Sequence, residues 1–190
     1  MRMMLARSIA AATLTLALAF PAAATTYAEM TDQQMTLESD AIIVGNVTQS
    51  KSQWIGKQLV TVVDMRVSET LKGDSKTTIQ VVLPGGVDLK RKIPVSMTYP
   101  GAPSLRQGES VVLFLKKTEL RPGAMVISGF SQGKYNIVTD ASGDTIVSRS
   151  AAAPSASKSR SLTAAPRTEK QRTLREFRAE IRDYLAKPKR

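Results

Sequence analysis

The stretch PGAPSLRQGESVVLFLKK, residues 100–117, contains a turn, a polar hinge and an unbroken apolar run. The hinge is Gln-Gly-Glu at residues 107–109, and the apolar run is Val-Val-Leu-Phe-Leu at residues 111–115. A short apolar run between turn signals is typical of a strand that is buried on both faces. We therefore predict that this stretch is scaffold, and that Glu109 pairs with a lysine or accepts backbone hydrogen bonds where the strand begins.

The alternation of half-buried strands continues on both sides of this stretch. In residues 58–67, Leu59, Val63 and Met65 fall on one face, while Val60 and Val62 fall on the other. Segments 125–130 and 134–138 are expected to pair with each other around residues 131–133. Further strands are predicted at residues 41–50, with a bulge or bend at Gly45, and at residues 77–84. Residues 92–97 predict a weaker strand whose proline indicates an edge position, and residues 139–147 predict a hairpin. A T-x-x-Q capping box at Thr31 predicts a short helix over residues 32–39. Many short strands with one short helix predict a mainly β domain, either a small closed barrel or a sandwich, over residues 25–150.

The first residues have the pattern of a secretory signal peptide. Arg2 and Arg7 precede an apolar run, and an Ala-x-Ala site follows at residues 22–24. The apolar run of residues 9–20 is too short to span a hydrocarbon core of about 30 Å. We therefore predict a signal peptide at residues 1–24, export to the periplasm or the cell exterior, and no transmembrane segment after cleavage.

The last forty residues are more basic than the body. Residues 151–190 contain 11 Lys/Arg and 4 Asp/Glu, whereas residues 25–150 contain 14 and 12. Residues 151–167 are rich in Ala, Ser and Pro and predict a flexible linker. A capping box at Thr168 and Gln171 predicts a basic amphipathic helix over residues 168–187.

This predicted helix carries an apolar stripe with arginines around it. The stripe consists of Leu174, Phe177, Ile181, Tyr184 and Leu185. We expect it to dock on the barrel, because an isolated helix of this length is marginally stable in water. The arginines are then expected to face outward, where they form a tentative site for an anionic surface: Arg172, Arg175, Arg178 and Arg182.

Composition removes several kinds of catalytic site. The chain contains no Cys and no His, which excludes disulfides, Ser-His-Asp and Cys-His catalysis, and the usual zinc sites. Carboxylate sites and a Ser-Lys pair remain open, but no spacing marks either of them. We therefore expect a protein that is not an enzyme and holds no cofactor or metal. Export argues against nucleic acid as the target of the basic tail.

One segment between the first two predicted strands suits recognition. Residues 49–58, QSKSQWIGKQ, read as a loop that holds the single tryptophan, Trp54, beside Ile55, with Lys51 and Lys57 around them. Aromatic side chains on loops dominate binding hot spots. The other reading is that Trp54 folds back and closes one end of the barrel. The two readings predict a binding surface or a piece of core.

The chain resembles a group of exported bacterial proteins of uncharacterised function over most of residues 31–140. The matching segments are residues 40–47 (DAIIVGNV), 67–73 (VSETLKG), 84–86 (PGG), 100–103 (PGAP), 108–115 (GESVVLFL) and 129–133 (GFSQG). Leu105 departs from the pattern, which more often has an aromatic residue there. More distantly, the order of strands is similar to the OB-like barrel of tissue inhibitors of metalloproteinases and netrin modules. Those inhibitors act through an N-terminal cysteine, whereas the predicted mature chain begins with Thr25.

Together these observations predict a small OB-like barrel with a short N-terminal helix and a C-terminal amphipathic helix. The predicted function is that of an exported, non-enzymatic binding or inhibitory module that acts on another envelope or extracellular protein. Two alternatives stay open: binding of an anionic envelope surface through the basic C-terminal helix, and the role of a hydrolase accessory enzyme.

Overall fold

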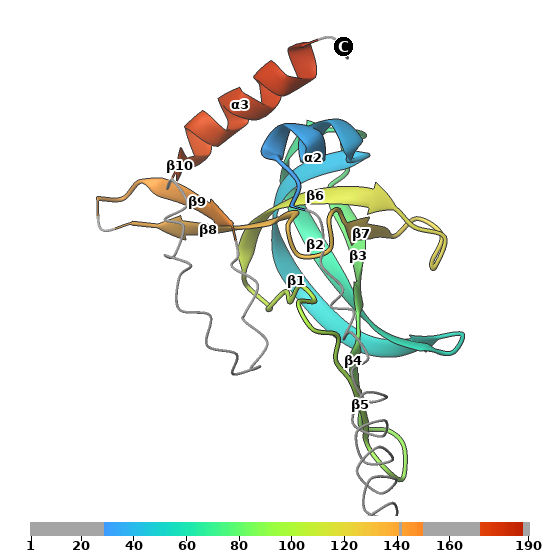
Figure 1. The fold of residues 1–190 in the computed structure, drawn as a ribbon. Helices are drawn as coiled ribbons and strands as arrows, with labels where there is room; N and C mark the ends of the chain where they lie inside the picture. The colour runs from blue at the N-terminus through green and yellow to red at the C-terminus, as the bar shows by residue number, and fades with distance from the viewer. Residues whose placement is uncertain (1–28, 141, 150–171, 188–190) are drawn as a thin grey trace, which may run out of the picture.

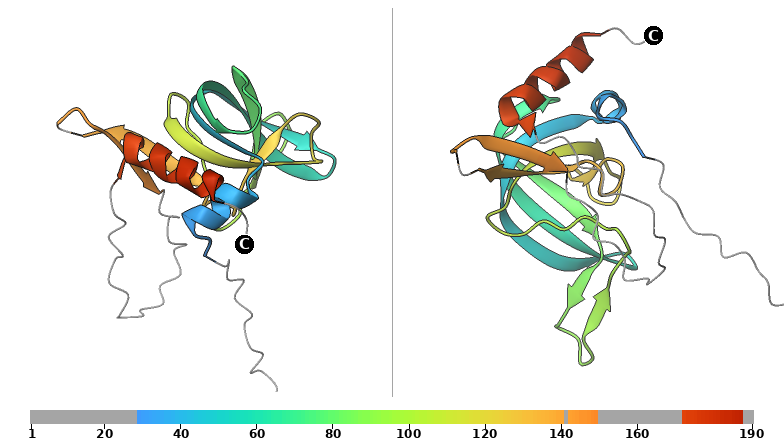
Figure 2. Two further views of the ribbon diagram at one scale, coloured as in Figure 1. Left: turned by 90° about the horizontal axis from the view of Figure 1, so that it is seen from above. Right: turned by 60° about the vertical axis from the view of Figure 1, so that its left-hand side comes forward.

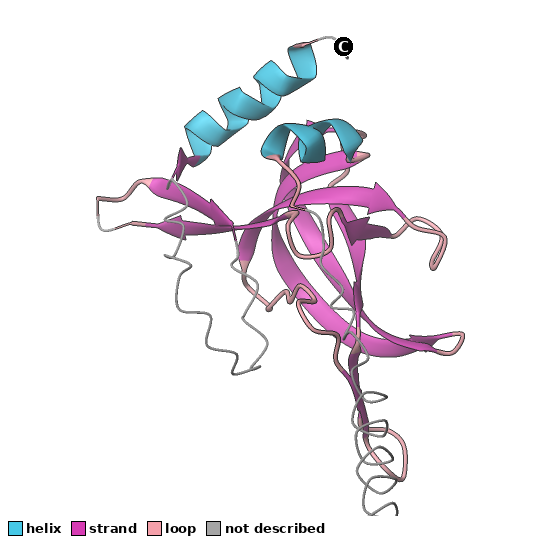
Figure 3. Cartoon of the chain, in the orientation of Figure 1, coloured by secondary structure: helices cyan, strands magenta, loops and turns pink. Residues whose placement is uncertain are grey.

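The computed structural model describes residues 29–140, 142–149 and 172–187, and this part of the chain is mainly β (Figures 1 and 3). The predicted signal peptide, residues 1–24, lies outside the described residues, as do the predicted linker, residues 151–167, and the capping box at Thr168. No helix in the described part of the chain is long and apolar enough to cross a membrane.

The short N-terminal helix α2 (Asp32–Glu38) confirms the predicted capping box. The Thr31 hydroxyl accepts a hydrogen bond from the Gln34 backbone N–H, and the Gln34 side chain accepts one from the Thr31 backbone N–H. Two backbone donors at the helix start are thereby satisfied. The helix buries Met35 and Thr36 and lies against the outer side of the sheet (Figure 1).

Five strands form a ring of pairings. They are β1 (Ala41–Ile55), β2 (Gln58–Lys72), β3 (Thr78–Pro84), β6 (Ser110–Lys117) and β7 (Met125–Ile127). The pairing runs from β1 through β2, β3, β7 and β6 back to β1. The step from β3 to β7 is parallel and consists of one residue pair, Val81 and Met125. This arrangement agrees with the partly open five-stranded barrel of OB-like folds.

The apolar run of residues 111–115 forms most of β6, one strand of this ring. All five side chains are fully buried, as predicted for a strand covered on both faces. Glu109 also follows the prediction, because its carboxylate lies 2.5 Å from the Lys134 ammonium and accepts a hydrogen bond from the Arg106 backbone N–H. The register of β1 on β2 shifts at Gly45, which confirms the predicted bulge.

Two sequence predictions about the sheet are wrong. Residues 49–58 are not a loop, because β1 and β2 stay paired from the bulge to Ile55 and Gln58 and a two-residue turn at Gly56-Lys57 joins them. Residues 125–130 and 134–138 do not pair with each other. Instead β7 and β8 (Lys134–Thr139) follow one another along the same edge of β6. The turn at residues 128–133 connects them. The Phe114 backbone N–H donates a hydrogen bond to the Gly133 carbonyl, and the Phe114 carbonyl accepts one from the Ser128 backbone N–H.

The C-terminal elements extend the sheet and then cross it. β9 (Thr145–Arg149) forms the predicted hairpin with β8, and β10 (Arg172–Thr173) pairs with β9. Helix α3 (Leu174–Ala186) follows directly. The predicted helix start at residue 168 is wrong, because Arg172 and Thr173 are extended and the capping box that opens the helix is Thr173 with Glu176.

Helix α3 docks on the body beside α2 and β9, as its apolar stripe predicted (Figure 2). Phe177 and Ile181 are 1% exposed and pack with Met35, Phe114 and Tyr135 in a second core outside the ring. Leu174 is partly buried in the same core, but Leu185 is 37% exposed. The stripe therefore docks through its first three members.

Candidate functional site

A two-stranded hairpin projects from the barrel at the end opposite α3 (Figures 1 and 2). It consists of β4 (Gly86–Asp88) and β5 (Val95–Met97), which pair only with each other among the described strands. The bend before β4 needs glycine, because Gly85 has a φ of 85° and a Cβ there would lie 2.4 Å from the Met97 carbonyl oxygen. The chain can therefore leave β3 sharply and return close to its own path.

The tip of this hairpin, residues 89–94, exposes large aliphatic side chains. Leu89 is 74% exposed and Ile93 is 77% exposed, and Val87 on β4 is 49% exposed. Isolated exposed aliphatic residues are ordinary, but three on one projecting element form a surface that water solvates poorly. The tip is therefore a candidate contact surface.

The same tip is strongly basic. Lys90, Arg91 and Lys92 follow one another between the two aliphatic residues, and all three are exposed. The acidic side chain nearest in sequence, Asp88, lies at the base of the tip, where its carboxylate accepts hydrogen bonds from the Lys90 backbone N–H and from Arg91. Leu89 and Ile93 flank the three basic residues in sequence. This combination favours an anionic partner that also has an apolar depression.

Trp54 braces the hairpin. Its indole Nε1 donates a hydrogen bond of 2.7 Å to the Asp88 carboxylate, and the Arg91 guanidinium lies over its ring at 4.5 Å. The hydrogen bonds from Trp54 and from the Lys90 backbone, together with the charge of Arg91, lower the pKa of Asp88. Two residues earlier on the same face of β1, the Ser52 hydroxyl accepts a hydrogen bond from the Val87 backbone N–H. The end of β1 thus holds β4 at two points.

The four predicted binding residues on the first hairpin lie on different faces. Trp54 is half-buried against β4, so it neither stands free on a loop nor closes the barrel. Ile55 packs on the apolar outer face of β2 and β3 with Val60. Lys51 is exposed on β1, and Lys57 is exposed in the turn. The structure therefore connects Trp54 with the projecting hairpin and leaves the other three around its base.

The four predicted arginines of the tail also have different environments. Arg172 donates to Asp32 at 2.7 Å and pairs with Glu180, and Arg178 pairs with Glu69 at 2.5 Å. Arg175 and Arg182 are exposed. The expectation that the arginines face outward is therefore wrong for Arg172 and Arg178, because the carboxylates of the body and of α3 itself hold them.

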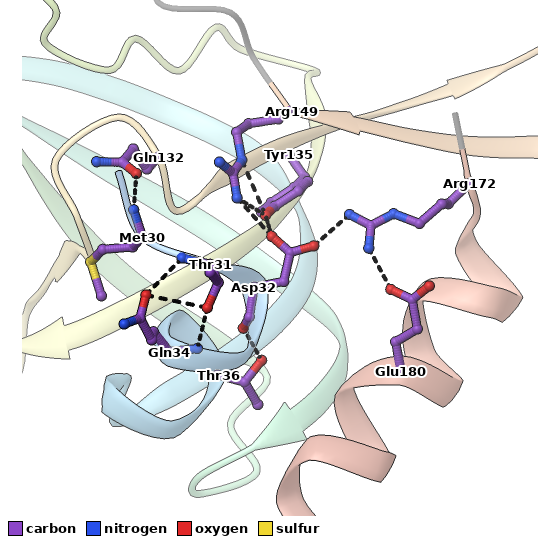
Figure 4. Close-up of polar contacts among 10 residues, drawn as sticks. All are labelled: Met30, Thr31, Asp32, Gln34, Thr36, Gln132, Tyr135, Arg149, Arg172 and Glu180. Atoms are coloured by element: carbon purple, nitrogen blue, oxygen red, sulfur yellow. Dashed lines mark hydrogen bonds and ion pairs between the residues drawn. The ribbon is translucent and has the colours of Figure 1, made fainter. Parts of the chain in front are cut away.

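Asp32 is the centre of the polar contacts that hold α3 in place (Figure 4). Its carboxylate accepts from Arg149 at 2.6 Å and from the Tyr135 hydroxyl at 2.5 Å, in addition to Arg172. Burial alone raises the pKa of Asp32, but the hydrogen bonds from Tyr135 and Arg172 and the charges of both arginines outweigh it and lower the pKa. Burial and the charge of Asp32 raise the pKa of Tyr135. A cavity of about 540 Å³ adjoins this network, and its ionic side chains include Asp32, Arg149, Arg172 and Glu180, which pair with one another.

Sequence reasoning missed the projecting hairpin as a site. Residues 92–97 were predicted only as a weak edge strand. The signal lies in residues 86–94, GVDLKRKIP, where aliphatic and basic residues mix between a glycine pair and a proline. Such a mixture suits neither a buried strand nor a polar turn.

No protein-family model matches the chain, and no curated protein matches it in sequence.

Proposed function

We propose that the protein is an exported, non-enzymatic binding module that docks onto another protein through the tip of the β4–β5 hairpin. The observation that carries the proposal is the exposure of Leu89 and Ile93 on a projecting element, on either side of three consecutive basic residues. Export rests on the signal-peptide pattern of residues 1–24.

The chemistry of the tip defines the partner. Leu89 and Ile93 require an apolar pocket, since their aliphatic surface gains most when it leaves water. Lys90 and Lys92 favour acidic side chains around that pocket, which would speed the encounter and orient the complex, while Arg91 pairs with Asp88 in the hairpin itself. The partner is therefore a protein with an apolar depression bordered by Asp or Glu.

The bracing of the hairpin supports recognition by a preformed surface. Trp54 and Ser52 bond to β4, and Thr61 donates a hydrogen bond to the Gly85 carbonyl where the hairpin begins. A contact element that is already ordered loses less conformational entropy when it binds. The role of Trp54 in this proposal is to position the hairpin and to widen its contact area at the base.

The polar contacts at Asp32 fit a structural role. Asp32 pairs with Arg149 and Arg172, and Arg172 pairs with Glu180. Groups that neutralise one another in a structural contact are poorly suited to activate a substrate.

The test is capture of proteins from the exported fraction with the purified protein and two variants. Leu89→Asp changes the tip, and Val138→Asp changes an aliphatic residue of β8 that is 51% exposed. The proposal predicts a captured protein that is retained by Val138→Asp, lost with Leu89→Asp and released by moderate salt. Capture that Leu89→Asp leaves intact would contradict it.

The alternative, an anionic envelope surface bound through the C-terminal helix, has less support. Arg172 and Arg178 are engaged with carboxylates, and the apolar stripe that a membrane would receive is mostly buried. Arg175 and Arg182 remain exposed for such a role. Binding of anionic vesicles that Arg175→Glu abolishes and Leu89→Asp does not would favour this alternative.

A further inference from the structure

We propose that a groove formed where the ends of β2 and β3 meet β7 is a binding site for an uncharged, largely apolar small molecule. The apolar groove, as we call it, is lined by residues that include Val60, Val82, Tyr99, Leu120, Val126 and Phe130. Its volume is about 420 Å³, within the range of small-molecule sites. The inference does not rest on the proposed function, because the groove is separate from the hairpin tip.

The floor of the groove is apolar and rigid. Val60 and Val82 are 2% exposed and pack with Val62 and Ala124 in a cluster on the outside of the barrel. Cross-strand pairing of β2 with β3 fixes their positions. At the rim, Tyr99 is 40% exposed and Leu120 is 42% exposed. An apolar floor with a partly open aromatic and aliphatic rim is the usual form of a pocket for a small apolar ligand.

The composition of the groove lining indicates which class of ligand it would bind. Among the described residues that line the groove there is no Lys, Arg, Asp or Glu, in a chain with 27 basic and 16 acidic residues. A charged ligand would leave water without gaining an ionic partner, which is costly. Gln58 and Tyr99 provide the groups that could orient one neutral polar atom of the ligand.

One wall of the groove contains a strained backbone position. Phe130 is a non-glycine residue with a φ of 63°, a strained conformation for a bulky side chain. The turn that imposes it is held by the bond from the Gln132 backbone N–H to the Gly129 carbonyl and by the bond from the Met30 backbone N–H to the Gln132 side chain. Such strain persists where the surroundings enforce it, and ligand contacts are one such place. The turn places Phe130 in the wall of the groove.

The experiment is a fluorescence titration of the purified protein with the neutral probe N-phenyl-1-naphthylamine. We expect saturable binding to one site. Leu120→Glu should weaken the binding about tenfold or more, because the carboxylate would have to be desolvated beside the probe. Tyr99→Lys tests a second residue at the rim in the same way. Both residues are well exposed at the rim, so thermal melting should show that both variants are folded.

Two matched controls separate the groove from other apolar surface. Val138→Glu changes an exposed aliphatic residue on β8, and Leu89→Glu changes the hairpin tip. Both should leave the affinity for the probe unchanged. The proposal is overturned if the wild-type protein shows no saturable binding, if Leu120→Glu and Tyr99→Lys both bind the probe as the wild type does, or if Leu89→Glu abolishes the binding.

Discussion

At the scale of single residues, the ion pair of Glu109 and Lys134 shows how one charge is kept in the interior. The Lys134 side chain is 6% exposed, and its ammonium also donates to the Ser104 carbonyl at 2.6 Å. Glu109 lies at the edge, with its side chain 22% exposed. The lysine therefore bears the larger free-energy cost of desolvation. Loss of the Glu109 carboxylate should destabilise the protein more than loss of the Lys134 ammonium.

We predict that Glu109→Gln lowers the free energy of unfolding by about 2 kcal/mol, because it leaves the buried ammonium without its counter-charge. Lys134→Met should cost less, since it removes the buried charge and leaves a carboxylate that water can reach. Chemical denaturation of the two variants measures both values. A greater loss in Lys134→Met would show that the carboxylate is the more buried partner.

Trp54 acts on a neighbouring element rather than on the barrel core. We predict that Trp54→Ala lowers the free energy of unfolding by about 1–2 kcal/mol, the sum of one hydrogen bond and one cation–π contact. Its main effect should be local, with faster amide hydrogen exchange over residues 86–97 and little change over β1 and β2. Equal changes in exchange throughout the sheet would contradict the bracing role.

At the scale of elements, helix α3 is held by two kinds of contact. Phe177 packs edge-on against Phe114, with the ring centroids 6.1 Å apart, and at a tilt against Tyr135, with the centroids 4.8 Å apart. Ile181 lies in the same core. Asp32 then connects α2 to Arg149 on β9 and Arg172 on β10. The apolar stripe provides most of the stabilisation, while the ion pairs set how the helix lies on the sheet.

The aromatic contact gives a direct prediction. Phe177→Ala should lower the free energy of unfolding by about 3–5 kcal/mol, as expected for a buried aromatic side chain. Leu185→Ala on the same helix should cost less than about 1 kcal/mol, because the side chain is 37% exposed. Similar losses in both variants would show that α3 docks through its whole stripe.

The Asp32 contacts predict a dependence of stability on pH. The pKa of Asp32 is lower in the folded protein than the value near 3.9 of an unfolded chain. Its contribution to stability is therefore complete above about pH 4 and is lost as the pH falls toward the lowered folded value. Melting temperatures of the wild type and Asp32→Asn should differ at pH 7 and converge below pH 4. A difference that stays constant down to pH 3 would contradict this role for Asp32.

At the scale of the whole molecule, the barrel carries its functional candidates on its outside. The hairpin projects from one end, and α2 and α3 cover the second core on another side (Figures 1 and 2). The apolar groove lies where the ends of β2 and β3 meet β7. The scaffold was largely predictable from the sequence, because the apolar run at residues 111–115, the bulge at Gly45 and the capping box at Thr31 are local signals.

The parts of the fold and of the candidate site that the sequence did not predict depend on contacts between residues far apart in the chain. The register of β7 and β8 on β6 follows from how the turn at residues 128–133 bonds to Phe114, which no local pattern records. The start of α3 was predicted at Thr168, whereas Thr173 with Glu176 opens the helix, because the pairing of Arg172 and Thr173 with β9 keeps these two residues extended. The candidate site was missed because Trp54 was interpreted by its own neighbours in sequence, whereas its partner in the structure is Asp88.

Site-specific photo-crosslinking tests most directly whether the hairpin tip contacts another protein. The photoreactive residue p-benzoylphenylalanine would replace Ile93 at the tip or Val138 on β8, both of which are exposed. We predict a covalent adduct with a protein from position 93 and none from position 138 when cells are irradiated. An adduct that forms from position 138 and not from position 93, or adducts with lipid alone, would contradict the account.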